Sequence, residues 1–301
     1  MYDIIVIGSG TAGMTSALYA LRAGRTVLIL ECNGIGGQIA TSPKVENFPS
    51  IKEISGTEFS DHLFEQISAL GVEFGFETVK SVADNGATKT VITEEGEHEA
   101  KAVIIATGLE HRPLPVPRAD EMVGHGLSYC AVCDGLFFKG KDVAVVGGGN
   151  TALQDAAYLC GYCRTVYLIH RRDAFRGDDH NVKALSSKEN VKFVLDTVVT
   201  ELVGEDAITA VKVKNVKTNA ESEIPVSGVF SAVGQTPKCE IFRGLVDLDE
   251  SGYVVAGEDC KTSREGVFVA GDCRTKSVRQ LTTAAADGAT AATAASAYIG
   301  I

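Results

Sequence analysis

A Cys-x-x-Cys motif followed by an acidic residue is the strongest candidate for chemistry in this sequence. The two thiols are Cys130 and Cys133, and Asp134 follows directly. Thiols at this spacing can lose two electrons to form a small disulfide, and their surroundings can lower the pKa of one of them. A carboxylate beside them can move a proton to or from a thiolate. The motif therefore predicts a redox-active disulfide in which Asp134 handles the proton.

A second Cys-x-x-Cys, formed by Cys160 and Cys163, raises the alternative of a four-cysteine zinc site. The segment between the two pairs already contains a strand pattern, a glycine-rich turn and a helix pattern, and the second pair falls where that helix ends. Small apolar residues are expected at such a position. We therefore predict that Cys160 and Cys163 are packing thiols and that the chain has no metal site.

Two glycine-rich turns with the same pattern are candidates for binding dinucleotides. One follows the apolar run 4–7 and the other follows the run 143–146, and each opens a stretch with helical periodicity. In such a turn, glycines allow a tight bend and a close approach of the backbone to a pyrophosphate, while the helix N-terminus offers N–H groups to the phosphates. The predicted contact residues are Gly8, Ser9, Gly10, Thr11, Ala12 and Gly13 in the first turn and Gly147, Gly149, Asn150 and Thr151 in the second.

The residues beyond the two turns predict two different nucleotides. In each copy a second apolar run follows the helix pattern, and it ends at Glu31 in the first copy and at His170 in the second. A carboxylate at that position accepts hydrogen bonds from ribose hydroxyls and repels a 2′-phosphate. Basic side chains there bind a 2′-phosphate by charge-assisted hydrogen bonds. The first site is thus predicted to bind a dinucleotide without that phosphate. The second is predicted to bind NADP(H) through His170, Arg171, Arg172 and Arg176.

The elements that must position these residues form an α/β fold. Short apolar runs bounded by glycine alternate with helix-length stretches, which is typical of parallel βαβ units, and two further buried strands are expected within 102–108 and 266–272. A proline-rich stretch at 112–117 has the character of an extended linker, and a second junction is expected near 234–237. We predict two Rossmann-like dinucleotide-binding domains, the second inserted into the first. Residues 1–110 and 241–301 form the first domain, and residues 111–240 form the inserted one.

The composition argues against several other classes of protein. The 301 residues are 45% hydrophobic and carry a formal net charge of −11. That charge opposes nucleic-acid binding, because phosphates require clustered Lys and Arg. No apolar run is long enough to predict a membrane-spanning helix. The chain passes directly from Met1 into an apolar strand pattern without a secretory leader, so we expect a protein of the reducing cytoplasm.

Taken together, these motifs resemble those of low-molecular-weight bacterial thioredoxin reductases over almost the whole chain. The resemblance also covers the segments 36–38, 45–49, 106–108, 270–272 and 279–280. It implies FAD in the discontinuous domain, NADPH in the inserted domain and a homodimer. It also implies that electrons pass from NADPH to FAD, then to a Cys130–Cys133 disulfide, and finally to oxidised thioredoxin or a similar small protein.

The resemblance implies specific roles for residues of this chain. Cys133 would be the thiol nearest the flavin, Cys130 would attack the thioredoxin disulfide, and Asp134 would be the general acid and base. A Gly-Asp pair would contact the flavin ribityl chain and phosphate region, and an Arg-Gln pair would flank the isoalloxazine ring. Beyond the first glycine-rich turn and Glu31, the residues implied to bind FAD are Gly36, Gly37, Gln38, Asn47, Thr107, Gly108, Gly271, Asp272, Arg279 and Gln280.

Turnover by such a relay requires movement. The disulfide and the nicotinamide must each reach the flavin, yet both belong to the inserted domain. We therefore predict alternating domain orientations hinged near 108–117 and 234–241. The alanine-rich stretch after Gln280 predicts a close-packed helix. Its N-terminal dipole would stabilise the reduced anionic flavin ring, or the helix serves only in packing or in a dimer interface.

The sequence departs from the family pattern at a few positions and leaves several alternatives open. Thr11 stands where proline is common, Gly177 where relatives often have alanine, and Val278 where many have an aromatic residue. None of these removes a group that the mechanism needs.

Some relatives take electrons from ferredoxin, but the second turn and its arginines favour NADPH. The alternatives are a flavin-dependent dithiol oxidase, a ferredoxin–NADP reductase and a zinc-stabilised nucleotide-sensing module.

Overall fold

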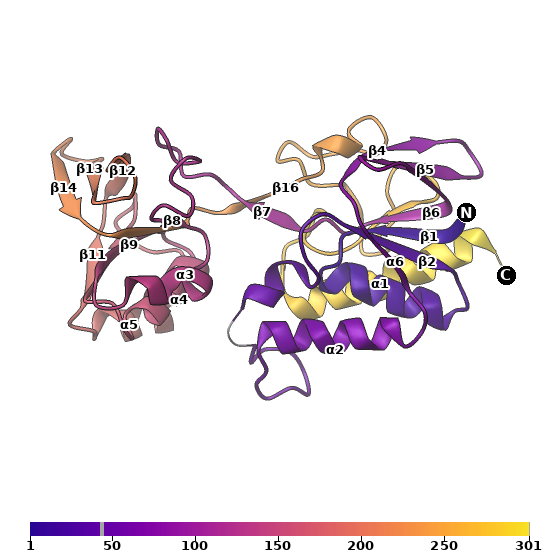
Figure 1. Cartoon of the computed structure of the whole chain (residues 1–301), viewed down its shortest axis with the longest axis horizontal. Coiled ribbons are helices and arrows are strands. Elements are labelled where there is room, and N and C mark those ends of the chain that lie inside the picture. Colours follow the sequence, from indigo (N-terminus) through magenta and orange to yellow (C-terminus); the bar gives the residue numbers. More distant parts are fainter. Residues whose placement is uncertain (43–44, 301) are drawn as a thin grey trace. The chain divides into compact units, whose positions relative to one another are not determined.

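The computed structural model describes residues 1–42 and 45–300. The chain divides into two compact units, one formed by Met1–Glu110 with Thr236–Ile301 and the other by His111–Gln235. The chain leaves the first unit through β7 (Leu109–His111) and returns through β16 (Gln235–Pro237), and these two strands pair with each other (Figure 1). The second junction therefore lies at residues 235–236, within the stretch 234–237 where it is expected, and the first unit resumes at Thr236 rather than at 241.

The first unit is built on a seven-stranded sheet ordered β3-β2-β1-β6-β5-β4, with β17 paired to β6. Strands β1, β2, β3, β6 and β17 run parallel, whereas β4 and β5 form an antiparallel extension. The strands are β1 (Tyr2–Ile7), β2 (Val27–Glu31), β3 (Glu73–Phe76), β4 (Val79–Asp84), β5 (Lys89–Thr93), β6 (Glu97–Ile105) and β17 (Val267–Val269). The helices are α1 (Thr11–Arg22), α2 (Gly56–Ser68) and α6 (Leu281–Ile299), with short 3-10 helices at Gly37–Thr41 and Glu240–Phe242.

Both faces of this sheet are covered, which explains why its central strands are apolar without interruption. Successive side chains of a strand point to opposite faces. Ile4 and Val6 accordingly pack with residues of α1 and α6, on the helical side visible in Figure 1. Ile5 and Ile7 pack on the other face, with Phe242 and the antiparallel strands β4 and β5. A parallel sheet covered on both sides is the arrangement that a continuous apolar run predicts.

The inserted unit has a five-stranded parallel sheet, ordered β11-β10-β9-β15-β8, and a three-stranded antiparallel sheet, ordered β12-β13-β14. Its core again has two sides: α4 covers one face of the parallel sheet, and β12 and β13 cover the other. The strands are β8 (Leu127–Ser128), β9 (Asp142–Gly147), β10 (Thr165–Ile169), β11 (Val191–Val194), β12 (Thr197–Val203), β13 (Ala210–Asn215), β14 (Glu221–Pro225) and β15 (Gly228–Ala232). The helices are α3 (Ala131–Asp134), α4 (Asn150–Leu159) and α5 (Asp179–Ser186), with a 3-10 helix at Gly135–Phe138.

The predicted α/β fold with two strand–turn–helix units is confirmed. Helix α1 begins directly after Gly10 and helix α4 directly after Gly149. The strand expected within 266–272 is β17 (Val267–Val269), and it lies between Gly266 and Gly271, which both adopt left-handed backbone with φ of 76° and 85°. No helix in the described part of the chain is long and apolar enough to cross a membrane.

Candidate active site

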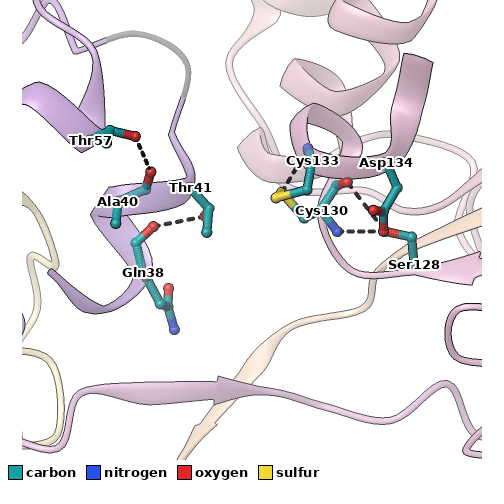
Figure 2. Close-up of a disulfide and its surroundings, with 8 residues drawn as sticks. All are labelled: Gln38, Ala40, Thr41, Thr57, Ser128, Cys130, Cys133 and Asp134. Atoms are coloured by element: carbon teal, nitrogen blue, oxygen red, sulfur yellow. Dashed lines mark hydrogen bonds between the residues drawn. A yellow bond between two sulfur atoms is a disulfide. The ribbon is translucent and has the colours of Figure 1, made fainter. Parts of the chain in front are cut away.

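Cys130 and Cys133 are joined by a disulfide at the start of helix α3, with their Cα atoms 5.3 Å apart (Figure 2). Cys130 is the N-cap residue of that helix, and its Sγ accepts a hydrogen bond of 3.1 Å from the backbone N–H of Cys133. Cys133 is exposed and Cys130 is half-buried. The predicted redox pair is therefore oxidised here, and it lies on the surface of the inserted unit.

Ser128, at the end of β8, connects Asp134 to the disulfide loop (Figure 2). Its Oγ donates to Asp134 Oδ2 at 2.7 Å and accepts from the backbone N–H of Cys130 at 3.0 Å. The predicted acid–base residue is thereby linked to the backbone of Cys130 by a buried hydroxyl. Sequence reasoning missed Ser128, because a single serine before the motif carries no recognisable signal.

Replacing Ser128 with alanine should slow the sulfur chemistry and leave the nucleotide sites intact. The loss of a hydrogen bond to a charged group costs about 1.5–3 kcal/mol, so we expect the rate of disulfide exchange to fall roughly tenfold or more. Rapid mixing under anaerobic conditions separates this step from flavin reduction. Ser186→Ala is a matched control, because that hydroxyl donates only to Lys183 O within helix α5. Equal slowing of flavin reduction in Ser128→Ala would contradict the assigned role.

The second glycine-rich turn, in the inserted unit, has the form of a phosphate-binding turn. No side chain caps the N-terminus of α4, so its first N–H groups are not satisfied by a capping residue. A Cβ added at Gly147 would lie 2.4 Å from Ala232 O and 2.9 Å from the Cβ of Ala152. Strand β9, helix α4 and strand β15 therefore approach one another too closely for a larger residue at Gly147 or Ala152, as the glycine-rich pattern predicts.

The arginines beyond β10 form an exposed cationic surface. Arg171, Arg172 and Arg176 are exposed, and none forms an ion pair with a carboxylate in the part of the chain that the structure describes. The loop that carries them folds back on the turn, since Arg176 N–H donates to Gly148 O at 2.7 Å and Asp178 N–H donates to Asn150 Oδ1 at 2.7 Å. Cationic side chains beside a phosphate-binding turn suit an additional phosphate.

Unlike these arginines, His170 is buried. It is 5% exposed, its ring stacks on Phe175, and a Cβ added at Gly148 would lie 2.2 Å from the ring. Burial lowers the pKa of His170, and the three neighbouring arginines lower it further. The neutral ring therefore packs against the glycine-rich turn at Gly148. Its predicted contact with the nucleotide stays a prediction.

The first glycine-rich turn, in the other unit, is held by Glu31. The Oε2 atom of Glu31 accepts from both the N–H and the hydroxyl of Ser9 at 2.8 Å, and Oε1 accepts from the N–H groups of Cys32 and Asn33 at 2.9 Å. No side chain caps α1, and a Cβ added at Gly13 would lie 1.9 Å from Gly8 O. The carboxylate predicted to meet a ribose thus also fixes the turn to the end of β2.

The structure brings together the other residues implied to bind FAD, although they come from separate segments. Gly36 N–H donates to Ser9 O at 3.1 Å, so the segment 36–38 lies against the first turn. Asn47 Nδ2 donates to Gln280 Oε1 at 3.0 Å. Three further contacts complete the cluster: Gly8 packs on Ala106 and Thr107, Gly271 packs on Ala12, and Arg279 Nε donates to Asp272 O at 3.2 Å.

Asp272 provides a test of whether this cluster suits a flavin dinucleotide. Its Oδ1 atom is buried and has no hydrogen-bond partner among the described residues. Burial raises the pKa of Asp272 above its usual range, although Lys276 and Arg279 oppose the rise. A buried acceptor without a partner is costly, and a hydroxyl-bearing chain such as ribityl would satisfy it. The residues present therefore fit the predicted group.

The second cysteine pair lies at the end of helix α4 and is not joined by a disulfide. Cys163 is buried and its thiol donates to Phe138 O, whereas Cys160 is partly exposed and its thiol donates to Ala157 O. Both are free thiols that pack at the end of α4. Across residues 1–42 and 45–300, no group of three or more His, Cys, Asp or Glu side chains is arranged to hold a metal ion.

Comparison with known proteins gives the same assignment as the motifs. Residues 2–288 match the family of pyridine nucleotide-disulphide oxidoreductases. The chain belongs to this family. It is 40% identical to a thioredoxin reductase of Listeria innocua over 99% of this chain and 94% of the relative. It is 41% identical to a thioredoxin reductase of Mycolicibacterium smegmatis over 97% of this chain and 94% of the relative.

A solved structure of a relative has the same fold as this chain. A crystal structure of Lactococcus lactis thioredoxin reductase, in its FR conformation, superposes with a TM-score of 0.95 at 39% identity and covers 99% of both chains. The resemblance inferred from the motifs is confirmed. This member of the pyridine nucleotide-disulphide oxidoreductases is an enzyme that uses a flavin and a pyridine nucleotide for disulfide chemistry.

Proposed function

We infer that the chain is a thioredoxin-disulfide reductase that passes electrons from NADPH through FAD to the Cys130–Cys133 disulfide and on to thioredoxin or a similar small protein. The observation that carries this conclusion is the surface disulfide of α3, formed in a unit that also holds a glycine-rich turn followed by three exposed arginines. Neither a pure nucleotide-binding module nor a ferredoxin–NADP reductase needs that disulfide.

We assign FAD to the first unit and NADPH to the inserted unit. The uncapped α1, the carboxylate of Glu31 and the unpartnered Oδ1 of Asp272 support a flavin dinucleotide without a 2′-phosphate. The exposed Arg171, Arg172 and Arg176 support a nucleotide with that phosphate. Within each unit the nucleotide would bind at the carboxyl ends of the parallel strands.

The surface next to the disulfide supports a protein as the electron acceptor. Leu136 and Phe137, which lie in the 3-10 helix that follows α3, are 63% and 75% exposed. Two adjacent exposed apolar side chains beside a reactive group are unusual on a surface that contacts only water. A folded partner that presents its own disulfide to this surface would cover them.

The sulfur chemistry follows from the positions of three residues. When bound, the flavin supplies an electron pair taken as hydride from the pyridine nucleotide, which reduces the disulfide to two thiols. The Cys130 thiolate then attacks a sulfur of the partner disulfide, and a mixed disulfide forms as the partner's other sulfur leaves. Cys133 attacks Cys130 Sγ, so the partner leaves as a dithiol and the Cys130–Cys133 disulfide is restored. Asp134, held by Ser128, supplies and accepts the protons.

Three further features belong to the proposal. The chain acts as a homodimer in the cytoplasm, and the two domain orientations alternate during turnover. A thioredoxin-type protein is its partner, as the names of its relatives indicate for them. The dithiol-oxidase alternative is weaker, because it gives no use to the three exposed arginines.

An anaerobic titration tests this function directly. We expect purified yellow protein to lose its flavin absorbance on addition of about two equivalents of NADPH per flavin, because the Cys130–Cys133 disulfide and the flavin each take one electron pair, and to lose it poorly with NADH. Oxidised thioredoxin should then restore the absorbance. Reoxidation by oxygen but not by thioredoxin would favour the oxidase, and reduction only by ferredoxin would overturn the choice of NADPH. A colourless protein that binds no FAD would refute the proposed function.

A further inference from the structure

A buried carboxylate on helix α6, Asp287, joins three segments of the first unit. Its Oδ2 accepts hydrogen bonds from Gly271 N–H at 3.0 Å, from Arg274 Nε at 2.8 Å and from Lys276 Nζ at 2.8 Å. Its Oδ1 accepts from Arg274 Nη2 at 2.8 Å. Asp287 and Arg274 are 5% and 1% exposed, and the Lys276 side chain is 5% exposed. One carboxylate therefore accepts hydrogen bonds from a backbone N–H and from two buried cationic side chains.

These contacts fix the turn that carries Asp272. The N–H of Gly271, the residue before Asp272, donates to Asp287, and the carbonyl of Asp272 accepts from Arg279 Nε at 3.2 Å. Arg279 also donates to Arg274 O at 3.3 Å. The backbone on both sides of Asp272 is thus restrained, while one oxygen of its own carboxyl group has no partner among the described residues.

The packing of α6 leaves Asp287 little freedom to move. A Cβ added at the next residue, Gly288, would lie 2.4 Å from Ala12 O, so α6 presses directly against the backbone of α1. A Cβ added at Gly271 would lie 2.8 Å from the Cβ of Ala12. Ala12 of the first glycine-rich turn is therefore enclosed between the Gly271 turn and α6. A shift at Asp287 would move the two halves of the predicted flavin site relative to each other.

A gain in folding stability does not by itself explain why the ion pairs of Asp287 are buried. Replacing a buried ion pair with well-packed apolar residues is often neutral or stabilising, because desolvation offsets the attraction. Although burial raises it, the pKa of Asp287 is lowered overall by the hydrogen bonds from Arg274 and Lys276, so the group is charged at neutral pH. An apolar residue could not accept the Gly271 N–H. A charged acceptor with two oxygens at a fixed separation can hold both that N–H and the arginine.

We propose that Asp287 is a positioning residue of the flavin site, which orients the Gly271–Asp272 turn so that the carboxyl group of Asp272 faces the bound flavin. This proposal rests on the proposed function, because it takes FAD as the ligand of the first unit. The polar contacts of Asp287 are with Gly271, Arg274 and Lys276. Its effect reaches the flavin through the backbone of the turn.

The test is the affinity of flavin-free, full-length protein for FAD, measured by the fluorescence anisotropy of FAD. We expect Asp287→Asn to raise the Kd at least tenfold. An asparagine has one acceptor oxygen and one amide NH₂. With the oxygen at the Oδ2 position its NH₂ faces the donor Arg274 Nη2, and in the flipped orientation its NH₂ faces the donor Gly271 N–H, so either orientation sets two donors against each other and removes the negative charge. Glu258→Gln is the matched control, since that carboxylate also contacts Arg274, at 3.3 Å, but is 91% exposed. Its Kd should stay within about twofold of the wild-type value.

A double variant separates positioning from simple charge balance. Asp287→Asn with Lys276→Gln restores the wild-type net charge of the cluster and should restore the melting temperature of flavin-free protein, but its Kd for FAD should stay at least fivefold raised. Full recovery of FAD affinity would overturn the positioning role, as would an unchanged Kd in a folded Asp287→Asn protein. If Asp287→Asn does not fold, the double variant alone decides. Wild-type protein that binds no FAD would instead refute the proposed function.

Discussion

Serine at Cys130 or Cys133 is expected to abolish reduction of thioredoxin while NADPH still reduces the flavin. Each sulfur is indispensable, because the relay needs one thiolate to attack the partner and a second to release it. We expect the rate of protein-disulfide reduction to fall by roughly three orders of magnitude or more, the scale seen when a nucleophile is removed. Flavin reduction should change little, since the nucleotide turn and its arginines are separate from α3 in sequence.

The two variants should also differ from each other in their spectra. If Cys133 is the thiol nearest the flavin, the Cys130→Ser protein retains a thiolate there and should show a long-wavelength charge-transfer band. Cys133→Ser should lack that band, and the reverse result would exchange the two roles. Cys160→Ser is the control for the same motif spacing, because serine can still donate to Ala157 O. Loss of both half-reactions in either active-site variant would count against the relay.

Glutamine at Arg171, Arg172 and Arg176 together should raise the KM for NADPH about a hundredfold and leave turnover with NADH unchanged. Charge-assisted hydrogen bonds to a phosphate contribute about 1.5–3 kcal/mol each before solvent screening, so losing three of them would amount to more than roughly three powers of ten, which the screening of exposed side chains reduces to about two. The three side chains are exposed and lack carboxylate partners among the described residues. Their removal should therefore not disturb the fold.

Steady-state kinetics with both nucleotides check this expectation, and Arg164→Gln provides the control. Arg164 lies on the same unit just before β10 and pairs with Asp142 rather than facing the glycine-rich turn. Its KM for NADPH should match that of the wild type. An equal loss of NADPH and NADH activity in the triple variant would show that the arginines do not recognise a 2′-phosphate.

The parts of the fold that follow local patterns could be predicted from the sequence. A continuous apolar strand, a glycine-rich bend and an amphipathic helix each leave a signal within a few neighbouring residues, so α1 and α4 were expected where they occur. The contact of Gly36 with the first turn and that of Asn47 with Gln280 have no such local signal, and only the family resemblance linked these residues to one ligand. No periodicity connects segments so far apart in the chain.

The residues that hold the site in place could not be predicted, because their roles arise only from tertiary contacts. Ser128 and Asp287 are single polar residues without a motif, yet each fixes a predicted functional residue. The thiols of Cys239 and Cys273 likewise had no signal in the sequence. They are fully buried beside Thr107, where Cys239 Sγ lies 3.8 Å from Thr107 Oγ1. Such supporting groups become visible only once the fold places them.

The discontinuity of the first unit has a consequence for biosynthesis. Strand β17 completes the sheet beside β6, and α6 covers the helical face against α1, but both are translated only after the whole inserted unit. A ribosome that has released Gln235 has thus produced every residue of the arginine-bearing nucleotide site, while the site that surrounds Ala12 still lacks Gly271, Asp272 and Asp287. A nascent chain therefore cannot complete its flavin site until nearly all of its codons have been translated, whichever unit folds first.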